Sequence, residues 1–93
     1  MIEVEVENLE QLDEALTTSA NRVLLDNLSL ATLAAAVERR NLCDRRDLTL
    51  EASGNVDLTT VADIAATGVD YISVGSLTKN VIAADLSMRF LGA

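Results

Sequence analysis

The 93-residue sequence contains no histidine, a single cysteine and only two aromatic residues, Tyr71 and Phe90. The lack of histidine removes the commonest general base and the commonest metal ligand. Cys43 alone excludes an internal disulfide and a thiolate metal cluster, and a lone thiol fits a reducing compartment. Because aromatic residues are scarce, the core must be built mainly from leucine, valine, isoleucine and alanine.

Basic residues are also scarce, since 7 of them face 15 acidic residues and the net charge is −8. Nucleic acids and anionic membrane surfaces are bound through lysine and arginine, so this charge argues against both kinds of partner. No apolar run approaches the roughly 18 residues of a membrane-spanning helix. The N-terminus also lacks a basic segment that leads into an apolar one. We therefore expect one small domain located in the cytoplasm.

What the sequence does contain is a regular succession of strand and helix patterns. Residues 2–7 alternate between apolar and acidic with period two, and three short apolar strands are expected at 23–25, 48–52 and 71–74. Helix caps are expected at Asn8, Ser29 and Asp57, and a helix stop at Gly68. This succession predicts an α/β fold in which four parallel strands alternate with helices.

The helix patterns also predict which side chains are buried. The second helix is expected to bury Leu30, Leu33, Ala34 and Val37, and to carry Arg39 and Arg40 in its last turn. Residues 81–93 are expected to form a short closing helix.

Two of the expected strands end at a small residue followed by glycine, at Ser53-Gly54 and at Val74-Gly75. A turn with little side chain lets a phosphate approach backbone N–H groups directly. Ordinary βα loops, in which glycine only eases the turn, are the alternative interpretation. The motif alone leaves both open.

Acidic residues accompany these turns. Glu3, Glu5 and Glu7 share one face of the first strand, which is either a solvated edge or the wall of a barrel-like cavity. Asp26 ends the second strand. Ligands of barrels and open α/β sheets bind at the carboxyl ends of the strands. Glu5, Asp26 and the two glycine turns would then meet at one rim. Carboxylates for hydroxyl groups beside amides for an anion suit a sugar phosphate.

Five segments in the same order and at compatible spacing resemble the quinolinate phosphoribosyltransferase family, and they cover nearly the whole chain. They are residues 2–8, 24–27, 51–55, 67–75 and the tail from 77 to 90. The resemblance implies that the chain is the C-terminal portion of the family's barrel, a partial (β/α) barrel.

The resemblance implies an activity that composition does not show. The family transfers a phosphoribosyl group from phosphoribosyl pyrophosphate to quinolinate, releasing pyrophosphate and carbon dioxide and giving nicotinate mononucleotide for NAD synthesis. Mg²⁺ accompanies the donor. Glu5 and Asp26 would then be the catalytic residues, holding the ribose hydroxyls and the Mg²⁺-associated donor.

The resemblance also implies a phosphate site. Ser53, Gly54 and Gly75 would bind the 5′-phosphate through one hydroxyl and backbone amides. Lys79 falls where the family places a basic or imidazole side chain near phosphate, although a plain surface lysine is the alternative for this position.

The family's N-terminal domain and early barrel strands, which supply a basic cluster for quinolinate and pyrophosphate, have no counterpart in residues 1–93. We therefore expect a single domain that is a fragment and is inactive alone. The arginines do not replace that cluster, because they precede strands or end helices at the opposite rim: Arg22, Arg39, Arg40, Arg45 and Arg46. Exposed strand edges predict a homo-oligomer or an N-terminal companion polypeptide.

Two other functions remain open at this point. One is a non-catalytic fragment that binds phosphate or a mononucleotide. The other is a related pyridine phosphoribosyltransferase, or the phosphoribosyltransferase-like family associated with molybdenum transport operons.

Overall fold

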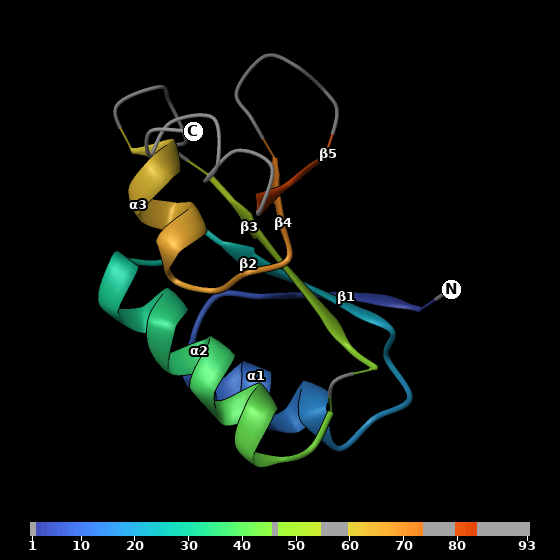
Figure 1. Cartoon of the computed structure of the whole chain (residues 1–93). Helices are drawn as coiled ribbons and strands as arrows, with labels where there is room; N and C mark the ends of the chain where they lie inside the picture. The colour runs from blue at the N-terminus through green and yellow to red at the C-terminus, as the bar shows by residue number, and fades with distance from the viewer. Residues whose placement is uncertain (1, 46, 55–59, 74–79, 84–93) are drawn as a thin grey trace.

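The computed structural model describes residues 2–45, 47–54, 60–73 and 80–83. The elements follow in the order β1 (Glu3–Val6), α1 (Leu9–Leu16), β2 (Arg22–Asp26), α2 (Leu30–Leu42), β3 (Thr49–Ser53), α3 (Val61–Ala66), β4 (Tyr71–Ser73) and β5 (Asn80–Ile82). The strands form one sheet in the order β1-β2-β3-β4-β5. The helices lie along one side of this sheet (Figure 1).

The four expected parallel strands are confirmed, because β1 to β4 pair in sequence and all in parallel. The fifth strand differs from the expectation, since residues 80–82 run antiparallel to β4. The predicted closing helix over 81–93 is therefore wrong at its start, and residues 84–93 lie outside the described residues. The free edge of β4 explains the difference, because an extended segment can satisfy its unpaired backbone groups.

Local capping determines where the helices begin. Asn8 accepts a hydrogen bond from the backbone N–H of Gln11 at 2.8 Å, and the Gln11 side chain accepts one from the N–H of Glu7 at 2.7 Å. Ser29 caps α2 by accepting from the N–H of Thr32 at 3.2 Å. The expected cap Asp57 lies outside the described residues, and α3 begins at Val61. Its expected stop is confirmed, since Gly68 follows with a φ of +98°.

The core lies between the sheet and the helices. Strand residues of one parity point into it, and the largest fully buried side chains include Val6, Val23, Leu25, Leu50 and Ile72. No helix in the described ranges has the length and apolar composition needed to cross a bilayer, and the longest, α2, has 13 residues.

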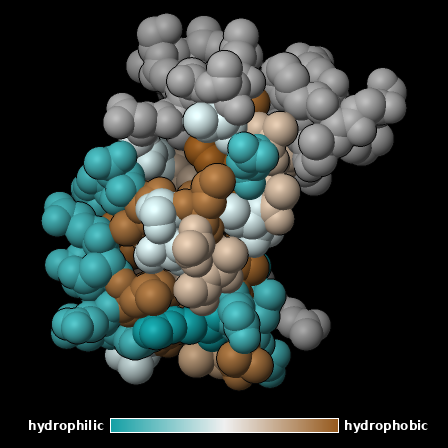
Figure 2. Space-filling model, turned by 90° about the vertical axis from the view of Figure 1, so that its left-hand side faces the viewer, coloured by the Kyte–Doolittle hydropathy of each residue, from teal (hydrophilic) through white to brown (hydrophobic). Residues whose placement is uncertain are grey.

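The buried face of α2 differs from the predicted one. Leu33 and Val37 are buried as expected, but Leu30 is 45% exposed and Ala34 is exposed as well. The buried stripe instead runs through Ala36 to Arg40. Alanine at both 34 and 36 leaves the rotation of the helix ambiguous in the sequence. Hydrophobic residues consequently appear among hydrophilic ones on the helix side of the molecule (Figure 2).

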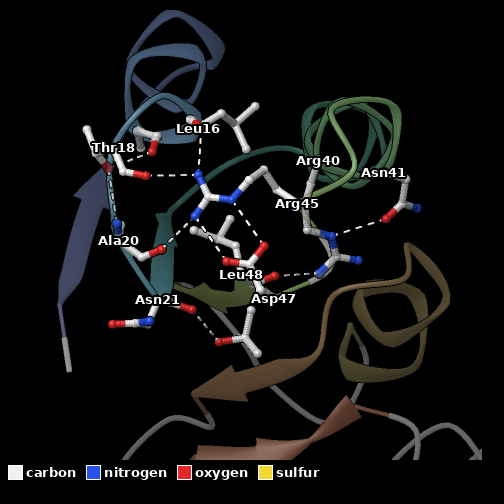
Figure 3. Close-up of polar contacts among 11 residues, drawn as sticks. Leu16, Thr18, Ala20, Asn21, Arg40, Asn41, Arg45, Asp47 and Leu48 are labelled. Atoms are coloured by element: carbon white, nitrogen blue, oxygen red, sulfur yellow. Dashed lines mark hydrogen bonds and ion pairs between the residues drawn. The ribbon is translucent and has the colours of Figure 1, made fainter.

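Arginines hold together the edge of the sheet where the parallel strands begin, here called the amino edge. The Arg45 guanidinium donates to the carbonyl oxygens of Leu16, Thr18 and Ala20 at 2.6–2.9 Å, and it also contacts Asp47 (Figure 3). A single side chain thus binds three backbone carbonyl oxygens along the connection from α1 to β2.

Arg40, in the last turn of α2, has a similar role for the segments that lead into β3 and β4. Its guanidinium contacts Asp70 at 2.5 Å and the carbonyl oxygen of Leu48 at 3.3 Å, and the residue is 8% exposed. Asp70 also accepts from the N–H of Leu50 at 2.8 Å. These contacts join α2 to the starts of β3 and β4. The prediction that the arginines lie away from the carboxyl ends is confirmed for Arg40 and Arg45, while Arg46 lies outside the described residues.

Candidate functional site at the carboxyl edge of the sheet

The face of the sheet that carries no helix is polar. Parallel register places Glu5 opposite Leu24, Leu24 opposite Glu51, and Glu51 opposite Tyr71. Residues two positions further along each strand share this face, and they lie at the edge where the parallel strands end, here called the carboxyl edge. Side chains in a strand alternate between faces, so this surface collects the polar residues of every strand.

The three glutamates of the first strand are exposed to solvent. In this chain β1 is an outer strand of the sheet, and whether the face also forms the wall of a barrel-like cavity stays a prediction. Glu5 lies on the polar face, opposite Leu24 and so two residues further from the carboxyl edge than Asp26 on the neighbouring strand.

Asp26 and Ser53 meet at the carboxyl edge. They are register partners at the ends of β2 and β3, and the Ser53 hydroxyl donates to the Asp26 carboxylate at 3.2 Å. A hydroxyl has one proton and two lone pairs, so this bond uses the only proton of Ser53. A ligand oxygen could accept the hydrogen bond of the Ser53 hydroxyl in place of Asp26. The Asp26 carboxylate could then accept a hydrogen bond from another group of the ligand.

Gly54 allows the loops after β2 and β3 to approach each other closely. Its φ is +115°, and a Cβ on it would lie 2.9 Å from the Cα of Asn27. The N–H of Asn27 donates to the carbonyl oxygen of Ser53 at 2.9 Å, and Asn27 itself has a φ of +54°. Only a residue without a side chain fits this position unstrained. Close packing against Asn27 therefore requires glycine at position 54, in addition to the phosphate-binding role predicted for it.

A hollow of about 360 Å³ opens beside this pair and is lined by Glu7, Asp26 and Asn27. Sequence reasoning did not assign Glu7 or Asn27 to the site. The period-two pattern of the first strand already placed Glu7 on the face of Glu5, so the alternation could have indicated Glu7 as a residue of the site. A larger hollow of about 520 Å³ lies between β1 and α1, and its lining includes Glu5 and Glu7.

The structure describes some of the residues of the predicted phosphate site. Ser53 and Gly54 lie at the carboxyl edge beside Asp26, and Glu5 lies on the same face. Gly75 and Lys79 lie outside the described residues. Of the residues named in the prediction, the structure thus brings Asp26 and Ser53 into contact, and it places Glu5 two residues short of that edge.

The carboxylates at this edge can be compared with the ligands that the implied Mg²⁺ would need. Within the described ranges, no group of three or more His, Cys, Asp or Glu side chains is arranged to hold a metal ion. Glu5 and Asp26 contribute two carboxylates from neighbouring strands. Mg²⁺ is commonly bound through one or two carboxylates together with substrate phosphates. The residues fit an ion that arrives with a polyphosphate ligand.

The fold and this edge define the chain as a portion of a βα-barrel type of protein, with its polar site at the carboxyl ends of parallel strands. The family described as "Quinolinate phosphoribosyl transferase, C-terminal domain" matches residues 1–89. The chain belongs to this family, as its motifs indicated.

Relatives and solved structures agree with this assignment. The chain is 43% identical over 86 residues to the nicotinate-nucleotide pyrophosphorylase [carboxylating] of Mycobacterium leprae, covering 92% of this chain and 30% of that protein. It is 38% identical over 99 residues to quinolinate phosphoribosyltransferase [decarboxylating] 1b of Nicotiana tabacum, covering 95% and 28%. The nicotinate-nucleotide pyrophosphorylase structure from Ehrlichia chaffeensis superposes with a TM-score of 0.74 at 40% identity, covering 84% and 27%.

The structure of the Francisella tularensis enzyme gives a TM-score of 0.71 at 45% identity, with 86% of this chain and 27% of that chain covered. The chain therefore spans less than a third of the length of the relatives it matches.

Proposed function

We propose that this chain carries the ribose-phosphate half of a quinolinate phosphoribosyltransferase site. In the full reaction the bond between the ribose C1 and pyrophosphate breaks, and a bond from the quinolinate nitrogen to C1 forms. The bond from the ring to the carboxylate beside that nitrogen then breaks, carbon dioxide leaves, and the ring carbon takes up a proton. The observation that carries the proposal is the meeting of Asp26, Ser53 and Gly54 at adjacent strand ends in a chain of this family.

In this proposal the Ser53 hydroxyl and the backbone amides of the Ser53-Gly54 turn bind the 5′-phosphate. Asp26 and Glu5 accept hydrogen bonds from the ribose hydroxyls, and the same carboxylates face the Mg²⁺ that accompanies the donor. Gly75 and Lys79 are proposed to complete the phosphate site. Catalysis by such a site is mainly positioning and electrostatic stabilisation of a ribosyl group with oxocarbenium character.

We further propose that the site is completed by a second polypeptide, either an N-terminal companion or another copy of the chain. The four-residue β1 is an outer strand. The hollow of about 520 Å³ beside it is lined by both β1 and α1. A neighbouring βα unit would cover both features. We place this assembly in the cytoplasm, which agrees with the free, exposed thiol of Cys43.

Calorimetric titration with phosphoribosyl pyrophosphate and Mg²⁺, and separately with quinolinate, tests the proposal. We expect binding of the first and not of the second, and no nicotinate mononucleotide formed by the chain alone. Ser53→Ala should weaken binding of the donor about tenfold, because a hydrogen bond to a charged group is lost. The matched control is Ser19→Ala, which makes the same change at an exposed position beyond the opposite edge. Absence of donor binding would contradict the proposal.

A non-catalytic phosphate-binding fragment is the second candidate, because the Ser53-Gly54 turn beside Asp26 would serve phosphate binding without catalysis. Light scattering and an activity assay after mixing with the N-terminal portion of a relative separate the two. Recovered activity supports the half-site, whereas donor binding with no recovery by any partner supports the fragment.

A further inference from the structure

The outer edge of β1 presents open backbone groups. Among the described strands, β1 pairs only with β2. The N–H of Arg22 donates to the carbonyl oxygen of Ile2 at 3.2 Å, so the backbone of Ile2 points toward β2. Successive residues of a strand direct their backbone groups to opposite sides. The N–H and C=O groups of Glu3 and Glu5 therefore point away from β2, toward the open edge.

This open edge ends at Glu7. The Gln11 side chain accepts a hydrogen bond from the N–H of Glu7 at 2.7 Å, so that N–H already has a partner within the chain. The open positions of β1 are thus Glu3 and Glu5. An exposed strand edge of this kind pairs readily with a further extended segment.

The hollow of about 520 Å³ beside this edge shows which chemistry such a segment needs. Its lining combines apolar side chains with carboxylates, and none of its described residues is basic: Val4, Val6, Ala15, Glu5, Glu7 and Glu14. Val6 belongs to the core on the helix side of the sheet, whereas Glu5 lies on the polar face. An added strand would meet apolar groups with one face and carboxylates with the other. Such a strand alternates between apolar and basic residues.

A second copy of the chain does not fit this edge. Two copies of β1 that pair in antiparallel, with their helices on the same side, would place glutamates opposite glutamates. Like charges directly opposite each other destabilise a strand pair. The net charge of −8 on each copy adds to this repulsion.

We propose that the outer edge of β1 binds an extended segment of a companion polypeptide in which apolar and basic residues alternate. This inference rests on the second polypeptide of the proposed function, and it assigns the edge to a basic companion in place of a second copy. The segment bonds to the backbone of Glu3 and Glu5, places its cations beside Glu5 and Glu7, and packs its apolar side chains toward Val4 and Ala15.

Three synthetic peptides of about eight residues test this chemistry on the 93-residue chain. One alternates valine and lysine, one has the same composition with all lysines in a block, and one alternates valine and glutamate. We expect the alternating lysine peptide to bind about fivefold more tightly than the block peptide, and the glutamate peptide not to bind. The block peptide has the same charge, so this ratio removes general attraction to an acidic protein.

Hydrogen exchange locates the bound peptide. The alternating lysine peptide should slow exchange at the N–H groups of Glu3 and Glu5, which point to the open edge. The N–H of Val4 points to β2 and should exchange as it does in the free chain. Protection at Val4 without protection at Glu3 and Glu5 would overturn the inference.

Two pairs of variants separate charge from backbone pairing. Glu5→Gln should lower the preference for the alternating peptide about threefold. Its control is Glu10→Gln, an exposed residue of α1 outside the lining of the hollow, which should leave the preference unchanged. Glu3→Pro removes an N–H that faces the open edge and should abolish the preference, because proline is compatible with an edge strand but cannot donate. Glu3→Gln keeps this N–H and should retain most of the preference.

Equal affinity for the alternating and block peptides overturns the inference. A dimer of the chain that Glu3→Pro dissociates in light scattering also overturns it, because a second copy would then occupy the edge. Binding of phosphoribosyl pyrophosphate is measured separately by calorimetry. Donor binding without selective peptide binding leaves the ribose-phosphate site intact and removes this inference alone. Selective peptide binding without donor binding contradicts that site and supports the companion segment.

Discussion

The two edges of the sheet are built in opposite ways. At the amino edge, Arg45 and Arg40 use their guanidinium groups on backbone carbonyl oxygens and on carboxylates, so cations and acceptors satisfy each other (Figure 3). At the carboxyl edge, Asp26 and Ser53 share one hydrogen bond of 3.2 Å beside a hollow. The polar groups of the amino edge bind one another, whereas Asp26 and Ser53 at the carboxyl edge could exchange their mutual hydrogen bond for bonds to a ligand.

This contrast fits the proposed function, in which the amino edge stabilises the fold and the carboxyl edge binds the ligand. Barrel proteins place their active sites at the carboxyl ends of strands and use the other end for stability. The acidic composition of the chain fits this division, because Arg40 and Arg45 are used at the amino edge. Substitutions at the two edges should therefore separate into losses of stability and losses of binding.

The largest expected effect is that of Arg45→Ala. It removes hydrogen bonds to three backbone carbonyl oxygens, those of Leu16, Thr18 and Ala20. We expect a loss of about 3 kcal/mol in the free energy of unfolding, measured by urea denaturation. Arg39→Ala is the control, because its ion pair with Asp13 is exposed and should contribute less than about 1 kcal/mol. Equal losses in both variants would break the comparison.

Gly54→Ala should have the next largest effect. Its Cβ would meet backbone atoms of Asn27 at 2.9 and 3.1 Å, and its φ of +115° is strained for alanine. We expect a loss of about 2 kcal/mol and weaker donor binding. Gly68→Ala is the control, since it also has a positive φ but lies against the Val37 side chain, away from the carboxyl edge. It should lower stability without changing the dissociation constant.

Asp26→Asn should have the opposite balance of effects, with a loss of ligand affinity and little loss of stability. The amide oxygen can still accept from Ser53, so unfolding free energy should change by less than about 1 kcal/mol. Affinity for phosphoribosyl pyrophosphate with Mg²⁺ should nevertheless fall about tenfold, because the carboxylate charge is lost. Asp13→Asn, a change of equal charge on the exposed surface of α1, should leave affinity unaltered. A stability loss as large as that of Arg45→Ala would contradict the division.

The smallest effect concerns pH. The hydrogen bond from Arg45 lowers the pKa of the Asp47 carboxyl below its ordinary value of 3.8. A carboxyl with a lowered pKa in the folded state adds stability above the unfolded pKa and loses it as pH falls through the folded one. Wild type should therefore lose slightly more stability than Asp47→Asn between about pH 5 and strongly acidic conditions. Identical acid unfolding curves would exclude this contribution.

The sequence predicted those regions of the fold that depend on neighbouring residues. Caps such as Asn8 and Ser29 need only a residue three positions away, and alternation within a strand is equally local. The pairing of residues 80–82 with β4 was missed, because it depends on an open edge elsewhere in the molecule. The burial of Arg40 was missed for a similar reason, since its partner Asp70 lies on a distant segment.

The candidate site follows the same pattern. The contact between Asp26 and Ser53 could be predicted, because both residues end apolar strands and parallel strands bring such ends together. Glu51 received no role, because an acidic residue within a strand looks the same whether it is exposed or buried. Its burial depends on Arg22 and Ser73, which lie on the two strands beside it.

The strand order β1-β2-β3-β4-β5 also bears on how the chain folds during synthesis. Each strand pairs with the one that precedes it along the chain, so no pairing has to wait for a distant segment to be translated. Contacts between successive units favour rapid folding. The sheet can grow by one unit at a time as the polypeptide leaves the ribosome, because each new strand pairs with the one made just before it.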